Sequence, residues 1–205
     1  MTDVLMTTRF LPGQLNAALN GVARVFDKGN LPLGVWASEL GLLNQLVTLC
    51  PLDRIAVTGS DGLRPFDLLA GTTASDCDGL AETEVRLLQR LEPFRMTAEL
   101  DPASVYELRA YEMAPSAIDT FIGHLSAAIP VRDRYSLIEG WWKPITGKQD
   151  QIIHLWKYRD LEHRRVVRQS ANDDPDWQAF LKKVVPLLRV MQSTVLNPLR
   201  LPVVP

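Results

Sequence analysis

Residues 34–49 read GVWASELGLLNQLVTL, and residues 140–155 read GWWKPITGKQDQIIHL. Shifting the chain by 106 positions superimposes the two stretches without a gap. Identical residues then coincide at five places: Gly34 with Gly140, Trp36 with Trp142, Gly41 with Gly147, Gln45 with Gln151 and Leu49 with Leu155. Self-similarity at a fixed period is typical of a duplicated structural unit, so this stretch decides the fold.

Two further landmarks extend the repeat toward the ends of each copy. Leu91–Arg95 (LEPFR) corresponds to Leu196–Arg200 (LNPLR) at an offset of 105, and Pro12 corresponds to Pro115 at an offset of 103. A short polar stretch over 96–104 reads as the linker between the copies. We therefore divide the chain into a divergent first unit, residues 1–96, and a second unit, residues 105–205.

The second unit shows its elements more clearly. Aromatic and β-branched residues predict strands, and apolar residues at helical spacing predict two helices that each begin at a proline. The expected order is a strand at 106–113, a helix after Pro115, strands at 137–143 and 151–158, a helix after Asp174-Pro175, and a strand from about 190 to 196. This βαββαβ order is that of a ferredoxin-like unit.

The first unit repeats this order with one departure. Its first helix is predicted from an apolar stripe at helical spacing: Leu15, Ala18, Leu19, Val22 and Phe26. Glycines and a proline interrupt the stretch 54–79, so we expect a shorter or irregular second helical region there.

A βαββαβ unit covers only one face of its sheet with helices, and the other face needs burial elsewhere. The neighbours Ile152 and Ile153 place apolar side chains on both faces of their strand. We therefore expect an α+β fold, with two tandem ferredoxin-like βαββαβ units packed sheet-to-sheet as an intramolecular dimeric α/β-barrel.

Composition argues against several classes of function. The 205-residue chain carries a formal net charge of −2, so it has no overall basic field that would attract nucleic acid. No apolar run approaches the roughly 20 residues that span a bilayer, and the N-terminal stretch does not resemble a secretory signal. Cys50 and Cys77 provide neither a disulfide framework nor a CxxC metal motif. We expect a cytoplasmic protein without nucleic-acid or membrane partners, in which the pseudo-dimer could pair again as a homodimer.

These residues resemble the NIPSNAP family, within the dimeric α/β-barrel superfamily. The family motif runs from Gly-x-aromatic through Ser-Glu-x-Gly and Asn-Gln to His-Leu-Trp, and here it is divided between the copies. The first copy keeps its beginning: Gly34, Trp36, Ser38, Glu39, Gly41, Asn44 and Gln45. The second copy keeps its end: Gly147, Asp150, Gln151, His154, Leu155 and Trp156. The first copy has Thr48 and Cys50 where the family has His and Trp. The resemblance implies the barrel fold and little about chemistry.

Reactive side chains are divided unevenly, since all three histidines and all four tyrosines lie in the second unit. His154 is the leading candidate, either as a general base or ligand or as a buried structural histidine. Arg109 offers a fork for an anion and Tyr111 a phenol, with a cross-strand salt bridge and core packing as the alternative. Neighbouring strands could bring these two residues close to His154. The residues expected to contact a ligand are Trp156, Tyr106, Trp142 and Gln151.

Two other groups of residues favour structural roles. A basic run is typical of a solvated helix face, with a patch for an anionic partner as the alternative: Lys157, Arg159, Arg164, Arg165 and Arg168. Glu39, Gln45 and Gln151 are expected to satisfy backbone groups at the hairpin turns.

Three functions are compatible with these residues. The first is a small-molecule-binding protein with a pocket at the barrel and no cofactor. The second is a cofactor-independent enzyme of oxygenase or isomerase type, with His154 as base, Arg109 as anion clamp and Tyr111 as proton donor. The third is a protein-interaction module that uses 54–79 or the basic run. The sequence contains neither HExxH nor GxGxxG, so we expect no metal site and no nucleotide loop.

Overall fold

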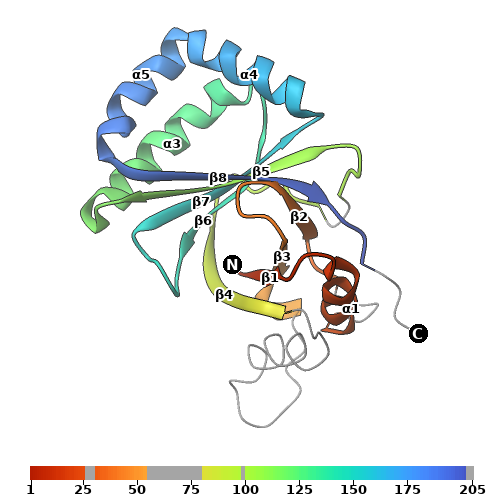
Figure 1. Cartoon of the computed structure of the whole chain (residues 1–205). Helices are drawn as coiled ribbons and strands as arrows, with labels where there is room; N and C mark the ends of the chain where they lie inside the picture. The colour runs from red at the N-terminus through yellow and green to blue at the C-terminus, as the bar shows by residue number, and fades with distance from the viewer. Residues whose placement is uncertain (26–30, 55–79, 98–99, 202–205) are drawn as a thin grey trace.

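A computed structural model describes residues 1–25, 31–54, 80–97 and 100–201 (Figure 1). Within these residues, eight antiparallel strands close into a barrel in the order β1-β3-β2-β8-β5-β7-β6-β4. The strands of the first half are β1 (Thr2–Phe10), β2 (Gly34–Leu40), β3 (Gln45–Pro51) and β4 (Leu80–Leu91). Those of the second half are β5 (Val105–Met113), β6 (Ile138–Pro144), β7 (Gln151–Tyr158) and β8 (Leu188–Pro198).

The strand order repeats within the barrel. Each half has its four strands in the ferredoxin-like order of fourth, first, third and second strand, β4-β1-β3-β2 and β8-β5-β7-β6. The second strand of each half pairs with the fourth strand of the other, so that β2 joins β8 and β6 joins β4. The predicted α+β fold of two tandem units in one intramolecular barrel is confirmed. The halves do more than face each other, because their sheet edges are also hydrogen-bonded.

The repeated Gly-x-Trp has a steric reason. A Cβ added to Gly34 would lie 2.2 Å from the Trp36 ring, and one added to Gly140 would lie 2.7 Å from the Trp142 ring. Each indole therefore lies over the glycine two residues before it on the same strand face, where a side chain would collide with it. The repeated Gly41 and Gly147 have positive φ angles of 112° and 72° at the two hairpin turns, a conformation that glycine adopts without strain.

Side chains that alternate along the strands fill the barrel. This interior cluster contains both tryptophans of the repeat: Leu5, Trp36, Val47, Leu49, Leu88, Trp142, Ile153, Leu155 and Leu196. The void among them measures about 10 Å³, close to the smallest space that holds one water. This part of the barrel interior is packed core.

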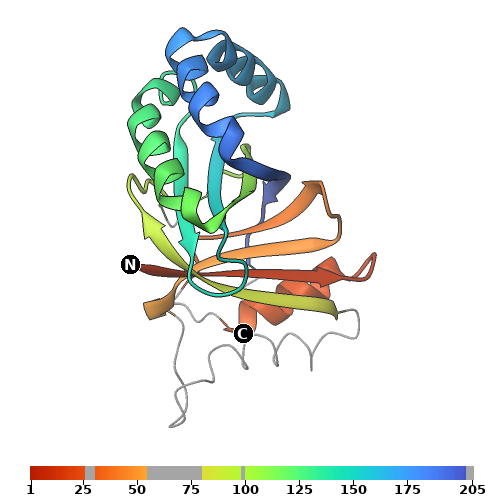
Figure 2. The ribbon, with the colours of Figure 1, turned by 90° about the vertical axis from the view of Figure 1, so that its left-hand side faces the viewer.

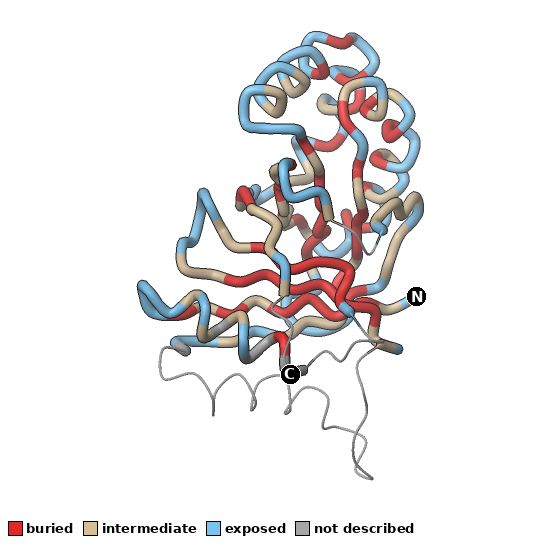
Figure 3. Tube along the Cα trace, turned by 90° about the vertical axis from the view of Figure 1, so that its right-hand side faces the viewer, coloured by how far each residue is buried: buried red, intermediate tan, exposed pale blue. Residues whose placement is uncertain are grey.

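Helices cover the outer face of each half-sheet. In the second half these are α3 (Ile118–Arg132), α4 (Leu161–Asp173) and α5 (Pro175–Val184), and Figures 1 and 2 show them together over β5–β8. On the opposite side of the molecule, α1 (Leu15–Val25) lies against the first half. Short 3-10 turns occupy η1 (Leu52–Arg54), η2 (Pro115–Ala117) and η3 (Val185–Leu187). Buried positions run along the strands, while the helices alternate between buried and exposed positions (Figure 3).

Local signals explain the helices of the second half. Asp174 caps α5, its carboxylate accepting hydrogen bonds from the backbone N–H groups of Asp176 and Trp177, and Pro175 occupies the first helical position as predicted. The predicted stripe of α3 is buried at Ile118, Phe121 and Leu125. No helix in the described part of the chain is long and apolar enough to cross a membrane.

The structure departs from the predicted elements in a few places. The predicted order of the second unit did not include α4. The last strand, β8, begins at Leu188, slightly before the predicted start at about 190. Glu39 accepts a hydrogen bond from the Asn197 side chain at 2.9 Å and so ties β2 to β8, whereas Ser38 serves the turn by accepting from the Gln45 backbone N–H. The predictions for Phe26, Cys77 and 55–79 lie outside the described residues.

Candidate functional site

The polar candidates meet on the outer face of β5 and β7. Arg109 lies directly opposite His154 in the antiparallel register, and Glu107 lies opposite Trp156. Tyr111 follows two residues after Arg109, so alternation places it on the same face. The structure therefore brings His154, Arg109 and Tyr111 together, as the predicted topology allowed.

His154 is buried, with 3% of its surface exposed. Its Nδ1 accepts a hydrogen bond from Trp156 Nε1 at 2.6 Å, and the Tyr111 ring stands edge-on to it at 4.6 Å between ring centroids. Burial and the nearby charge of Arg109 lower the pKa of His154 to about 3, so the ring is neutral at physiological pH. Because Nδ1 is an acceptor, the hydrogen-bond network assigns the ring proton to Nε2. That N–H has no partner among the described residues.

Glu107 is a fully buried carboxylate surrounded by arginines. Arg109 donates to it from the same strand at 2.7 Å, so the predicted ion pair of Arg109 exists within β5 and not across strands. Arg164 and Arg168 of α4 donate to its other oxygen at 2.6 and 3.1 Å. Burial alone would raise the pKa of Glu107, but these hydrogen bonds and charges outweigh it and hold the pKa well below its usual range.

The basic run is therefore only partly a solvated helix face. Arg165 is exposed and pairs with Glu162 one helical turn away, as that interpretation expects. Arg164 and Arg168 instead turn toward Glu107, so the prediction is wrong for these two residues. The physical reason is that a buried carboxylate requires cationic or hydrogen-bonding partners, and α4 brings two arginines within reach of Glu107 in addition to Arg109.

Arg132 is a second buried cation, which the sequence did not single out. It ends α3, is 3% exposed, and lies over two indole rings, 4.9 Å from the centroid of Trp156 and 5.6 Å from that of Trp177. Its Nη1 is buried without a hydrogen-bond partner in the described structure. Burial and the charges of Arg109 and Arg168 lower its pKa, yet a guanidinium stays charged at any physiological pH.

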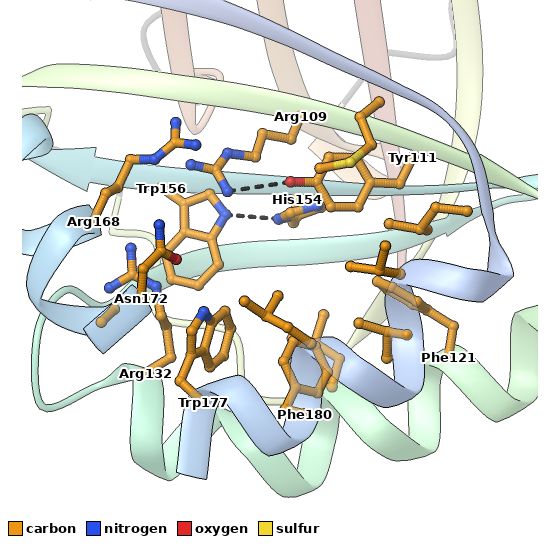
Figure 4. A pocket seen from close by; sticks show the side chains of 17 residues that line it. Arg109, Tyr111, Phe121, Arg132, His154, Trp156, Arg168, Asn172, Trp177 and Phe180 are labelled. Carbon is orange, nitrogen blue, oxygen red and sulfur yellow. Dashed lines mark hydrogen bonds between the residues drawn. The ribbon is translucent and has the colours of Figure 1, made fainter. Parts of the chain in front are cut away.

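These side chains line a cavity of about 160 Å³ between the sheet and its helices. Its polar lining is Arg109, Tyr111, Arg132, His154, Arg168 and Asn172. Its apolar lining includes Phe121, Leu125, Trp156, Trp177, Phe180 and Val184. Figure 4 shows Arg132, Arg168 and Asn172 gathered toward one end, with Phe121 and Phe180 toward the other. The cavity is thus amphipathic along its length.

Two predicted ligand residues lie elsewhere, on the inner face of the sheet. Tyr106 packs edge-on against Trp36 at 5.6 Å, and burial raises its pKa to about 12. Trp142 donates from Nε1 to the buried Asp3 carboxylate at 2.7 Å, and Arg90 pairs with the same carboxylate. The structure does not place Tyr106 and Trp142 with His154, and their contacts account for both as barrel core.

Gln151 lies at one end of the barrel. It accepts from Arg86 at 3.2 Å and donates to Glu112 at 3.1 Å, so its amide links three strands. A wider and more open hollow of about 450 Å³ lies at this end, with Arg86 and Glu84 in its lining. Among the described residues, no cluster of His, Cys, Asp and Glu side chains could hold a metal ion.

Residues 106–202 match the NIPSNAP family model. The chain is 33% identical over 98 residues to Protein NipSnap homolog 2 of Mus musculus, and the match covers 47% of this chain and 34% of the mouse protein. It is 24% identical over 196 residues to a NipSnap homolog of Dictyostelium discoideum, covering 91% of this chain and 85% of that protein. The match thus spans about a third of the length of the mouse protein and most of the Dictyostelium protein.

The fold of the whole chain also has a counterpart among solved structures. The crystal structure of an anthrone oxidase-like protein superimposes with a TM-score of 0.66, covering 97% of this chain and 91% of that chain. The two sequences are 11% identical, so this likeness concerns the fold alone.

Proposed function

We propose that residues 106–202, which match the NIPSNAP family model, bind a small molecule in the cavity between the sheet and its helices. Arg109, Tyr111, His154 and Trp156 come from the sheet side of this cavity, and Arg132 from α3. The first unit, residues 1–96, contributes the other half of the barrel that supports the sheet.

One observation supports the proposal above all others. Three buried nitrogen atoms in the cavity lining lack a hydrogen-bond partner in the described structure: His154 Nε2, Arg109 Nε and Arg132 Nη1. Leaving a buried donor unpaired costs roughly 1–3 kcal/mol, and more for a charged group. Unpaired donors on several residues that line one cavity support a binding site, where a ligand or bound water would supply the acceptors.

A cofactor-independent enzyme is the second candidate, because a tyrosine hydroxyl and a histidine N–H line the same cavity. The base role is the weak point of this hypothesis. The lone pair of His154 Nδ1 already accepts from Trp156, and its Nε2 carries the proton, so His154 is suited to donate a hydrogen bond. Glu107 is held ionised by arginines and is a poor base as well. Binding without catalysis therefore requires fewer changes in protonation.

The interaction module has the least support. Of its two expected surfaces, 54–79 lies outside the described residues except for Arg54, and Arg164 and Arg168 of the basic run bind Glu107. Arg165, an exposed arginine of the run, already pairs with Glu162.

A tryptophan at the mouth of the cavity tests the proposal. Met191 and Val190 are adjacent on β8 and both exposed, but only Met191 lines the cavity, because alternation directs Val190 to the other face. Met191→Trp should block the cavity, and Val190→Trp is the matched control. Native mass spectrometry of the purified protein reports any retained ligand, and ligand-observed NMR with a set of monocyclic aromatic fragments reports binding.

We expect the wild type and Val190→Trp to bind fragments or retain ligand, and Met191→Trp to lose both. Absence of any bound species with the wild type, or equal binding by Met191→Trp, would overturn the proposal. The same spectra report whether the chain is a 23.0 kDa monomer or a homodimer of pseudo-dimers.

A further inference from the structure

Arg132 is the feature that defines the chemistry of the cavity. It is a buried guanidinium with no ion-pair partner among the described residues, and its position over Trp156 and Trp177 provides cation–π contacts but no hydrogen-bond acceptor. Burying an uncompensated charge is costly, so an anion that enters the cavity would gain both charge pairing and hydrogen bonds.

The polar end of the cavity, where Arg132 and Arg168 lie, has more positive than negative charge around it. Arg109, Arg164 and Arg168 share the single carboxylate of Glu107, while Arg132 adds a fourth positive charge. His154 is neutral and contributes an N–H donor. Negative charge is therefore in deficit at the polar end.

The remaining cavity selects for an apolar group. Phe121 and Phe180 lie toward the end away from Arg132 and Arg168 (Figure 4). Leu125 and Val184 add further apolar lining. A volume of about 160 Å³ resembles that of an engineered protein cavity of roughly 150 Å³ that admits benzene. One six-membered ring with a short substituent fits this space, and a long acyl chain does not.

We propose that the ligand of this cavity is a small carboxylate that carries one ring-sized apolar group. The carboxylate pairs with the Arg132 fork, and the apolar group lies between the sheet and α5, against Phe180 and Leu125. This inference rests on the proposed function, since it names the class of molecule that the same cavity binds.

Phenylacetate and phenylacetamide test the inference, because the two probes have nearly the same shape and differ in charge. Calorimetric titration of the wild type should show phenylacetate binding at least tenfold more tightly than phenylacetamide. Arg132→Gln should remove this preference while still binding the amide, and Arg132→Lys, which keeps the charge but loses the fork, should fall between. Arg165→Gln is the matched control, since it removes an exposed positive charge outside the cavity.

The outcomes separate this inference from the proposed function. Equal affinities of the wild type for the two probes, or no binding of either while other aromatic fragments bind, would overturn the carboxylate and leave the cavity as a binding site. Loss of the preference in Arg165→Gln to the same extent as in Arg132→Gln would assign it to general surface charge and also overturn the inference. Circular dichroism checks that each variant is folded. The comparison of phenylacetate with phenylacetamide on the wild type needs no variant, so it tests the inference even if a variant fails to fold.

Discussion

The outer faces of the two half-sheets occupy equivalent places in the fold and differ in chemistry. On the second half, Arg109 lies opposite His154, and on the first half Met6 lies opposite Thr48. Two positions along the same strands and on the same face, the pair is Glu107 with Trp156 in the second half and Val4 with Cys50 in the first. The same backbone frame thus carries buried charges on one side and small or apolar side chains on the other.

The inner faces show the opposite behaviour. Each half retains its Gly-x-Trp, and both Trp36 and Trp142 fill the barrel. Closure of the barrel needs a core from both halves, whereas one cavity needs only one set of polar groups. The difference teaches that the duplicated residues serve the fold, and that the residues present once, on the outer face of β5 and β7, are the candidates for function.

Cys50 illustrates how inert the first face is. It occupies the place of Trp156, and its thiol donates to the Pro51 carbonyl oxygen at 3.4 Å. Burial raises the pKa of this thiol to about 12, so it is neither a thiolate nor a nucleophile at physiological pH.

The largest expected loss of unfolding free energy comes from replacing Glu107, the fully buried carboxylate on the outer face of the second half, with the residue found at the equivalent place in the first half. Glu107→Val installs the residue found at the equivalent Val4 and leaves Arg109, Arg164 and Arg168 without their shared partner. Breaking a buried charge network in this way costs about 3–5 kcal/mol of unfolding free energy. Urea denaturation measures it.

Val4→Ala is the matched change on the first face, and removing its two buried methyl groups should cost about 2 kcal/mol. A smaller loss for Glu107→Val than for Val4→Ala would mean that the charged face is not held together by Glu107.

The next largest effect is the dependence of the unfolding free energy on pH. It should distinguish the two outer faces, because His154 on the second half titrates and the equivalent Thr48 on the first half does not. The pKa of His154 is about 3 in the folded protein and about 6.5 in an unfolded chain. Between these values the unfolded state binds more protons, so the unfolding free energy falls as pH falls. Lowering the pH from 7 to 5 should remove about 2 kcal/mol through His154.

This pH range also separates His154 from Glu107. The pKa of Glu107 is depressed, so its contribution is lost only as pH falls below the ordinary carboxyl range, near 4. His154→Gln keeps an acceptor for the Trp156 indole and should flatten the slope between pH 7 and 5. An unchanged slope in this variant would show that His154 is not the buried neutral histidine described here.

The smallest expected change in unfolding free energy comes from replacing Arg132, the buried cation without an ion-pair partner among the described residues. Arg132→Met replaces the buried guanidinium with an apolar chain of similar length and should raise the unfolding free energy of the ligand-free protein by about 1 kcal/mol, since replacing buried charge with apolar groups is often stabilising. Thermal unfolding measures the change. Arg165→Met, on the exposed side of α4, should stay within about 0.5 kcal/mol of the wild type. A loss of stability in Arg132→Met would mean that the contacts with Trp156 and Trp177 outweigh the cost of burial.

The amino-acid sequence alone determined the duplicated barrel. The repeat around Gly34 and Gly140, the hairpin glycines and the Asp174-Pro175 cap are local signals, because steric exclusion over an indole, positive φ and helix capping each act within a few residues. Alternation along β7 likewise puts His154 and Trp156 on one face of the sheet, and the structure shows that the helices cover this face. Alternation also puts Tyr106 on the face opposite Arg109, because the two residues are three positions apart along one strand, and it therefore indicates that Tyr106 does not line the same cavity.

Only the tertiary structure decided which side chains share the cavity. Arg132 ends α3, Arg168 lies on α4, and both reach the sheet because the helices pack across β5 and β7. In the sequence, Arg164 and Arg168 look like neighbours of the exposed Arg165. Whether an arginine faces solvent or a buried carboxylate depends on long-range packing that brings α4 to Glu107, 57 and 61 residues away along the chain, and no local pattern encodes that contact.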